Sequence, residues 1–128
     1  MNKCILDSSA LLALLNSEPG AELVETLLSS SIMSTVNVAE VIAELDKRLD
    51  ITPNQSKEMV EAIINQIIPL DFKQAIEVGH LRKITEKFGL SLGDRACLAL
   101  AIASNAPVYT GDKAWAKLKL NCEIVFIR

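Results

Sequence analysis

The chain has 128 residues, of which 50% are hydrophobic and 23% charged, a composition typical of one globular domain spanning residues 1–128. Its longest apolar run, 96–103, is too short for the roughly 20 residues that cross a bilayer, and Asp7 interrupts the apolar stretch that a secretory signal needs, so we expect a cytoplasmic protein without a membrane segment. The formal net charge of −3 argues against a broad basic surface that coats DNA.

The first third of the chain predicts two strands and two helices. Residues 3–7 form a short apolar run that ends at an acid, and Ser8 and Ser9 offer an N-cap to a helix over 10–15. The Pro-Gly pair at 19–20 breaks this pattern, and a second helix follows near 23–28. Residues 32–35 then predict a buried strand.

The middle of the chain is mainly helical. An apolar stripe from Val38 to Leu49 predicts an amphipathic helix, and Pro53 suits the first turn of another, whose inward face extends to Ile67. A short strand is expected at 68–70. Residues 72–88 predict a further helix that ends at Gly89, a typical C-terminal cap.

The last third predicts a central helix and the end of a sheet. Ser91 can cap a helix over 92–105 whose middle is apolar on every face, so this helix should be buried. Strands at 107–110 and 123–127 flank a short helix at 113–118. Strands that alternate with helices predict an α/β fold, a three-layer α/β/α sandwich with a roughly five-stranded, mainly parallel sheet.

The chain has three cysteines and one histidine, which argues against a catalytic or metal site built from thiols or imidazoles. Cys4, Cys97 and Cys122 are odd in number and form no C-x-x-C pair, which argues against a disulfide framework and a zinc site. A single His80 excludes sites that need several imidazoles. The carboxylates are therefore the main candidates for chemistry.

Four acids occupy positions where a parallel sheet places its ligands. The ligand crevice of such a sheet lies beyond the carboxyl ends of the strands. Asp7 closes the first predicted strand, and Asp112 lies just past the strand at 107–110. Asp94 is in the first turn of the central helix, and Glu40 is near the start of the helix after the second strand.

A cluster of these acids would need a cation. Two carboxylates about 4 Å apart repel by about 4 kcal/mol at an effective dielectric constant of about 20. A divalent ion removes this conflict, and oxygen ligands without His or Cys favour Mg²⁺ or Mn²⁺ over Zn²⁺. Such a site would suit hydrolysis of a phosphodiester, because the ion neutralises the phosphate and activates a water molecule.

Each acid also has an ordinary structural interpretation. Asp7 can cap a helix, Glu40 can be a solvated helical acid, Asp94 can be a first-turn acid and Asp112 can belong to a Gly-Asp turn. Spacing and composition leave both interpretations open.

Four sequence blocks resemble a known family. They are Leu6-Asp7-Ser8-Ser9-Ala10-Leu11, Thr35-Val36-Asn37-Val38-Ala39-Glu40-Val41, the segment 89–101 around Gly93-Asp94-Arg95, and Thr110-Gly111-Asp112-Lys113-Ala114-Trp115-Ala116. In the number and order of its acids, the whole chain resembles PIN-domain proteins, specifically the VapC-type toxin ribonucleases of toxin–antitoxin systems.

This resemblance implies a metal-dependent endoribonuclease that a cognate antitoxin protein keeps silent, and homodimers are usual in such families. Asp7, Asp94 and Asp112 would hold Mg²⁺ or Mn²⁺ directly or through water, and Glu40 would complete the site. The alternative is a catalytically idle PIN-like module that binds a protein or RNA partner.

Four further residues are weaker candidates. The Ser8 and Thr110 hydroxyls would support the waters of the metal, although capping and turn roles explain them equally well. Arg95 and Lys113 directly follow two of the acids and would contact RNA phosphate, the alternative being a solvated charge or an ion pair.

Overall fold

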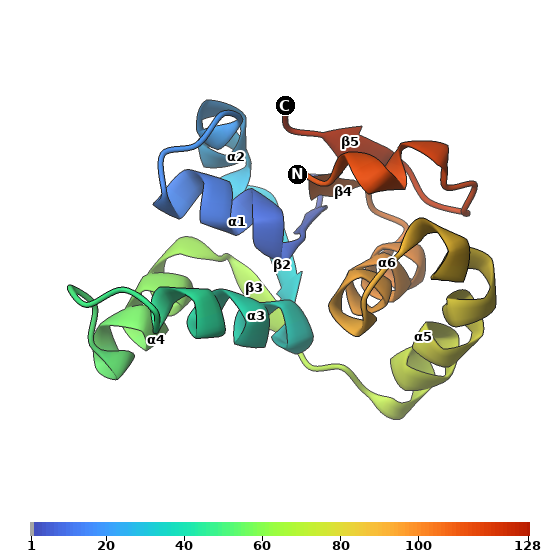
Figure 1. The fold of residues 1–128 in the computed structure, drawn as a ribbon, viewed down its shortest axis with the longest axis horizontal. Coiled ribbons are helices and arrows are strands. Elements are labelled where there is room, and N and C mark those ends of the chain that lie inside the picture. The colour runs from blue at the N-terminus through green and yellow to red at the C-terminus, as the bar shows by residue number, and fades with distance from the viewer. Residues whose placement is uncertain (1) are drawn as a thin grey trace.

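The computed structural model describes residues 2–128 and contains a five-stranded parallel sheet in the order β3-β2-β1-β4-β5 (Figure 1). The strands are β1 (Cys4–Leu6), β2 (Ser31–Ser34), β3 (Gln66–Ile68), β4 (Val108–Thr110) and β5 (Ile124–Phe126). Every neighbouring pair is parallel, so the connections between strands pass over the faces of the sheet.

Helices cover both faces of the sheet, which confirms the predicted three-layer α/β/α sandwich. The α-helices are α1 (Ser8–Leu15), α2 (Ala21–Leu27), α3 (Thr35–Leu45), α4 (Pro53–Ile63), α5 (Phe72–Thr85) and α6 (Leu92–Ser104), with 3₁₀ turns η1 (Leu28–Ser30), η2 (Glu86–Phe88) and η3 (Lys113–Lys117). In Figure 1, α5 and α6 lie to one side of the strands and α1 to α4 lie to the other. Among residues 2–128, no helix is long and apolar enough to cross a membrane.

Alternating strand residues divide the core into two apolar clusters. Ile5, Ile32 and Val108 pack with α5 and α6, whereas Leu6 and Met33 pack with α1, α3 and α4. Full burial of such side chains contributes about 1.5–3 kcal/mol each to folding. The middle of α6 is buried on nearly all sides, as its sequence predicts, and its first turn carries Asp94.

The structure corrects two predicted helix ends. Leu49 is fully exposed and lies beyond α3, which ends at Leu45, because residues 46–50 form exposed turns outside the core. Ile67 is not on the inward face of α4 but in β3, where it pairs with Met33 of β2. Pairing with the sheet therefore outweighs the helical spacing of the isoleucines.

The N-cap of α1 is also corrected. The cap is Asp7, whose Oδ1 accepts a hydrogen bond of 2.8 Å from the Ala10 amide, and Ser8 and Ser9 are the first two residues of the helix. Aspartate caps a helix as well as serine does and its charge suits the positive end of the helix. The carboxylate of Asp7 therefore lies at the junction of β1 and α1.

Candidate functional site

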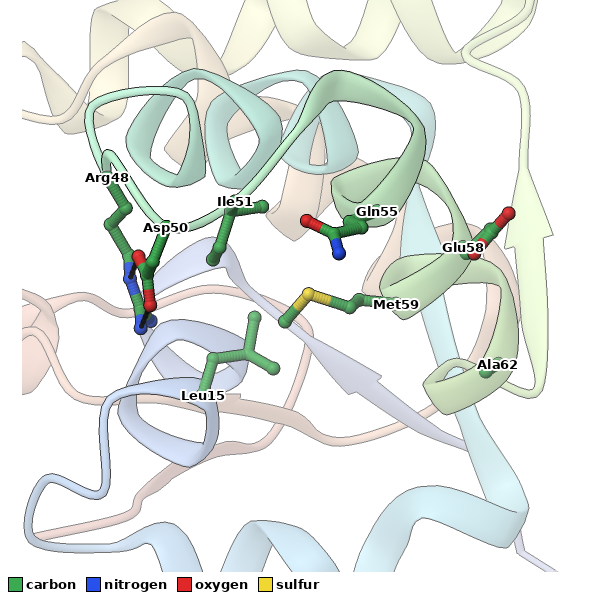
Figure 2. A pocket seen from close by; sticks show the side chains of 8 residues that line it. All are labelled: Leu15, Arg48, Asp50, Ile51, Gln55, Glu58, Met59 and Ala62. Atoms are coloured by element: carbon green, nitrogen blue, oxygen red, sulfur yellow. Dashed lines mark hydrogen bonds and ion pairs between the residues drawn. The ribbon is translucent and has the colours of Figure 1, made fainter.

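One cavity of the protein lies away from the four acids. This cavity, of about 540 Å³, is lined by Leu15, Ile51 and Met59 together with the ion pair of Arg48 and Asp50 (Figure 2). It lies at the C-terminal end of α1, about 12 Å along an eight-residue helix from Asp7. None of the four predicted acids lines it.

The acids instead surround the reversal point of the sheet. From β1 the chain continues to β2 and β3 on one side and returns to β4 and β5 on the other, so the carboxyl ends of β1 and β4 adjoin the crevice that usually binds ligands. Asp7 follows β1 directly, and Asp112 is two residues beyond β4. Helix α3 begins directly after β2 and carries Glu40, while α6 carries Asp94 in its first turn.

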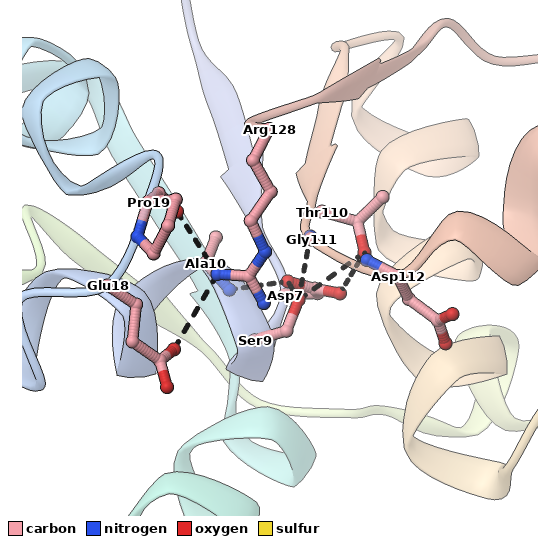
Figure 3. Close-up of polar contacts among 9 residues, drawn as sticks. All are labelled: Asp7, Ser9, Ala10, Glu18, Pro19, Thr110, Gly111, Asp112 and Arg128. Atoms are coloured by element: carbon pink, nitrogen blue, oxygen red, sulfur yellow. Dashed lines mark hydrogen bonds and ion pairs between the residues drawn. The ribbon is translucent and has the colours of Figure 1, made fainter.

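Asp7 is the most buried acid, with 3% of its surface exposed. Its Oδ1 accepts from Ser9 Oγ at 2.7 Å as well as from the Ala10 amide, and its Oδ2 accepts from Thr110 Oγ1 at 2.5 Å (Figure 3). Burial raises the pKa of Asp7 to about 6 even though these bonds lower it, and the charge of Asp94 adds to the rise. The site therefore holds a carboxylate whose charge is poorly compensated.

Two hydroxyl groups tie the end of β4 to Asp7. Thr110 Oγ1, which donates to Asp7, accepts from the Asp112 amide at 3.0 Å, and Ser9 Oγ accepts from the Gly111 amide at 2.9 Å. Asp112 in turn caps η3, with its Oδ1 accepting from the Ala114 amide. These contacts fix the positions of Asp7 and Asp112 relative to each other.

Glu40 is held against the start of α6. The Nδ2 of Asn37, a fully buried residue, donates to Glu40 Oε1 at 2.9 Å and to the Gly93 carbonyl at 3.0 Å. A Cβ at position 93 would overlap the Glu40 carboxylate, so only glycine fits there without displacing it. Asn37 and Gly93 therefore bring Glu40 beside Asp94.

Asp94 interacts electrostatically with the other acids. Its Oδ2 accepts from the Ser91 amide in a capping box that Ser91 completes, as the sequence predicts for this cap. Burial raises the pKa of Asp94, and the negative charges of Asp112 and Glu40 raise it further. Together with its effect on Asp7, this places Asp94 within electrostatic range of all three other acids.

The donor set suits a hard divalent cation, although the carboxylates are not arranged as a finished metal site. Among residues 2–128, no group of three or more His, Cys, Asp or Glu side chains is placed to hold a metal ion, and no salt bridge involves any of the four acids. Carboxylate oxygens are the ligands that Mg²⁺ and Mn²⁺ prefer, and the raised pKa values of Asp7 and Asp94 show that the negative charge of these two acids is poorly compensated. In this structure the acids of positions 7, 94 and 112 instead satisfy backbone amides at helix starts.

Several predicted supporting residues have other contacts. Ser9 rather than Ser8 supplies the hydroxyl that bonds Asp7. Arg95 donates to the Val78 carbonyl of α5 at 2.9 Å, and Lys113 donates to the Arg128 carbonyl and lies over the Phe126 ring. Thr110, by contrast, contacts Asp7 directly.

Sequence reasoning did not single out Ser9 and Asn37 as site residues. A serine two positions after an aspartate at a helix start is a local signal for a hydroxyl–carboxylate bond, and Asn37 precedes Glu40 by three positions, a spacing that faces side chains together in a helix. The contact of Asn37 with Gly93 joins distant segments, so no local pattern predicts it.

Comparison with known proteins agrees with this architecture. The model of the PIN domain family matches residues 4–120, so the chain belongs to the PIN domain family. Proteins of this family are in general nucleases. A search of curated protein sequences finds no match.

Solved structures share the fold over nearly the whole chain. The DNA-bound VapBC structure from Salmonella typhimurium matches with a TM-score of 0.75 and 20% identity, covering 100% of each chain. VapBC2 from Rickettsia felis, bound to a promoter DNA fragment, has a TM-score of 0.74 and 20% identity over 96% of this chain and 97% of that one. VapBC-1 from nontypeable Haemophilus influenzae has a TM-score of 0.71 and 20% identity over 97% of each chain.

Proposed function

We propose that the protein is an endoribonuclease that hydrolyses RNA phosphodiester bonds with Mg²⁺ or Mn²⁺ and acts as the toxin of a type II toxin–antitoxin pair. The observation that carries this proposal is the convergence of Asp7, Glu40, Asp94 and Asp112 around one edge of the sheet without a cation partner among residues 2–128. Membership of the PIN domain family supports hydrolysis as the reaction class.

Asp7, Asp94 and Asp112 would hold the cation, and Glu40 would complete the site. When bound, the ion supplies charge neutralisation for the phosphate and lowers the pKa of a water molecule. The chain itself fixes the acids: Ser9 and Thr110 donate to both oxygens of Asp7 and thereby favour its ionised form. Asn37 donates to Glu40 Oε1, and both oxygens of this carboxylate lie against Gly93 at the start of α6.

Replacement of Asp94 by Asn tests the proposed activity. Loss of a metal-holding carboxylate should reduce cleavage of single-stranded RNA by more than about a hundredfold, since even residues that only support a ligand cost 10- to 100-fold. The matched control is Asp50→Asn, which changes an exposed acid in the cavity of Figure 2. Cleavage by purified protein is followed on RNA and on DNA of the same sequence, with Mn²⁺ or with EDTA.

The proposal requires cleavage of RNA that needs Mn²⁺, survives Asp50→Asn and is lost in Asp94→Asn. Equal rates for the parent and Asp94→Asn would contradict the site, and cleavage of DNA alone would contradict the substrate class. Circular dichroism of each variant establishes that a loss of cleavage is not a loss of fold.

The capped carboxylates favour one second candidate, an idle PIN-like module that binds a protein or RNA. In the described residues, Asp7, Asp94 and Asp112 all engage backbone amides, which an idle domain would retain for stability alone. Retained binding of RNA without cleavage under any metal condition would favour this candidate.

An antitoxin protein is the proposed partner. The neighbours named above are VapBC proteins, and a further one, with 21% identity and a TM-score of 0.70, is a toxin–antitoxin complex from Klebsiella pneumoniae. Induction of the gene should arrest growth, and co-expression of a small neighbouring reading frame should relieve the arrest. Growth that continues after induction of folded protein would contradict the toxin role.

We also propose a homodimer formed through α5. One face of this helix is buried. Outside that face, the apolar side chains of Phe72, Ile76 and Ile84 are 80%, 48% and 51% exposed. A second copy of the chain packed against these three side chains would remove them from water. Phe72→Ser should shift the protein to a monomer in sedimentation equilibrium, and an unchanged mass would contradict this interface.

A further inference from the structure

The two residues after β5 run along the edge of the candidate site. The Ile127 amide donates to the Thr110 carbonyl at 2.9 Å, so the chain continues beside β4 past the end of the strand. Arg128 is thereby placed next to Gly111, between Thr110 and Asp112 in the sequence (Figure 3). These residues lie outside the part of the chain that the PIN domain model matches, residues 4–120.

Glycines on both sides make room for this segment. A Cβ on Gly111 would lie 3.0 Å from Nη2 and 3.1 Å from Cζ of Arg128, so the guanidinium lies close against the Gly111 backbone. A Cβ on Gly20 would lie 2.7 Å from the Ile127 carbonyl oxygen, and Gly20 also has a φ of +98°, which favours glycine. The fold therefore accommodates residues 127 and 128 closely at both contacts.

Arg128 is held from one side only. Its Nη1 donates to the Pro19 carbonyl at 3.1 Å and forms a long ion pair of 3.6 Å with Glu18 Oε1, while the side chain remains 34% exposed. Within residues 2–128, Nε and Nη2 donate no hydrogen bond. These donors are the part of the guanidinium that adjoins Gly111.

A short chain of hydrogen bonds connects this position to the acids. The Gly111 amide donates to Ser9 Oγ, and Ser9 Oγ donates to Asp7 Oδ1. The guanidinium thus rests on a peptide that is two hydrogen bonds from the most buried acid. Arg95 and Lys113, the basic residues beside the acids in sequence, are engaged with carbonyl groups.

We propose that Arg128 binds a phosphate of the RNA at the rim of the site, through Nε and Nη2. This inference rests on the proposed nuclease function and names a substrate-binding residue for it. A cluster of four acids repels an RNA backbone, so a cation fixed beside the cluster offsets part of that repulsion and directs a phosphate towards the edge of the sheet. Arginine suits this role because its planar fork matches phosphate oxygens in pairs.

Binding of labelled RNA tests the inference without relying on cleavage. The probe is a fluorescein-labelled single-stranded RNA of mixed sequence, and its anisotropy is measured against the Asp94→Asn protein with and without Arg128→Ala. Loss of the phosphate contact should weaken binding about five- to tenfold at low salt and reduce the slope of log K against log salt by about 0.7. Arg48→Ala, which removes an equal charge at the distant cavity, should leave both quantities unchanged.

The variant Gly111→Ala tests the same contact independently, by changing the position of the Arg128 guanidinium and not its charge. Its Cβ would push the guanidinium aside, so it should weaken RNA binding when Arg128 is present and add little when Arg128 is already alanine. Arg128→Lys should restore part of the affinity, because the charge returns without the fork. Thermal melting of each variant identifies any that fails to fold.

The possible outcomes distinguish failure of the Arg128 phosphate contact from failure of the proposed nuclease function. If Asp94→Asn protein binds RNA and Arg128→Ala changes neither affinity nor salt slope, Arg128 has no phosphate contact and the proposed nuclease function stands. If no folded variant binds RNA, the nuclease function fails and the inference fails with it. Equal losses for Arg128→Ala and Arg48→Ala would show a general charge effect and would also overturn the inference.

Discussion

Asp7 and Asp50 are aspartates in opposite electrostatic settings near the two ends of α1. Burial raises the pKa of Asp7 to about 6, and the hydroxyl and amide donors around it carry no charge. Asp50 is exposed, and hydrogen bonds from Arg48 lower its pKa, with Nη2 to Oδ2 at 3.1 Å and Nε to Oδ1 at 3.3 Å. The cavity provides its acid with a cation, whereas the site does not.

This difference distinguishes the Arg48–Asp50 ion pair at the surface from the candidate active site around Asp7. An exposed pair such as Arg48–Asp50 is screened by water and contributes little to stability, and its charges are balanced without a ligand. Burial raises the pKa of Asp7 and of Asp94, and neighbouring negative charges raise both further, so binding of a cation would lower the free energy of their ionised forms. The cavity of Figure 2 is therefore the less suitable place for a charged substrate, despite its volume.

The largest effect is expected for Asp7→Asn in metal-free protein. The folded-state pKa of Asp7 lies above its unfolded value of 3.8, so the folded state binds more protons and its stability falls as pH rises from about 4 to about 6. Asparagine removes this ionisation penalty but loses the acceptor for the Thr110 hydroxyl at every pH, so the difference in free energy of unfolding between variant and parent should be more favourable to the variant at pH 7.5 than at pH 4, by up to about 3 kcal/mol. Urea denaturation in EDTA at both pH values measures the change.

A difference between Asp7→Asn and the parent that is the same at pH 7.5 and pH 4 would contradict the account of Asp7, because it would show that ionisation of the carboxylate carries no penalty in the folded state. Asp50→Asn serves as the comparison in the same titration and should show no gain at neutral pH.

A smaller effect, on metal binding more than on stability, is expected for Gly93→Ala. The added Cβ displaces the Glu40 carboxylate, which is the end of a flexible side chain, so unfolding should change by less than about 1 kcal/mol. The affinity for Mn²⁺ should fall about tenfold or more, since a misplaced supporting group costs that much. Isothermal titration calorimetry with Mn²⁺ measures the affinity.

Gly79→Ala is the matched control, because a Cβ there meets nothing within 4 Å and alanine favours the helix. An equal change of Mn²⁺ affinity in both glycine variants would show that the position of Glu40 does not matter.

The smallest effect is expected for Asp50→Asn. Removal of this exposed partner of Arg48 should leave the free energy of unfolding nearly unchanged, because water already screens the pair. A large decrease in the free energy of unfolding, measured by urea denaturation, would contradict this comparison of Asp7 with Asp50, because it would show that the fold depends on the Arg48–Asp50 ion pair.

Much of the fold can be predicted from the sequence because its signals are local. Ser91 caps α6 and Gly89 ends the preceding turn with a φ of +72°, both as their residue types predict. The apolar faces of α6 require a central helix, and alternation of strands and helices requires a layered sheet. The helical spacing of Ile67 predicts a place in α4, whereas the structure has it in β3, because pairing with β2 depends on a strand that is distant in the sequence.

The acids of the site could be proposed from the sequence, but their supporting contacts could not. Asp7 and Asp112 are recognisable by their positions after apolar strands. Asn37 acts through Gly93, and Arg128 acts beside Gly111, so each depends on a contact between segments that only the fold brings together. The roles of all these residues in catalysis stay predictions.

Binding of Mn²⁺ tests most directly whether the acids at the edge of the sheet share a cation. The free ion is monitored by electron paramagnetic resonance during titration of the parent, Asp94→Asn and Asp50→Asn proteins at pH 7.5. We predict saturable binding to the parent and to Asp50→Asn, and its loss in Asp94→Asn. Absence of saturable binding at millimolar Mn²⁺, or equal binding by Asp94→Asn, would contradict the shared cation.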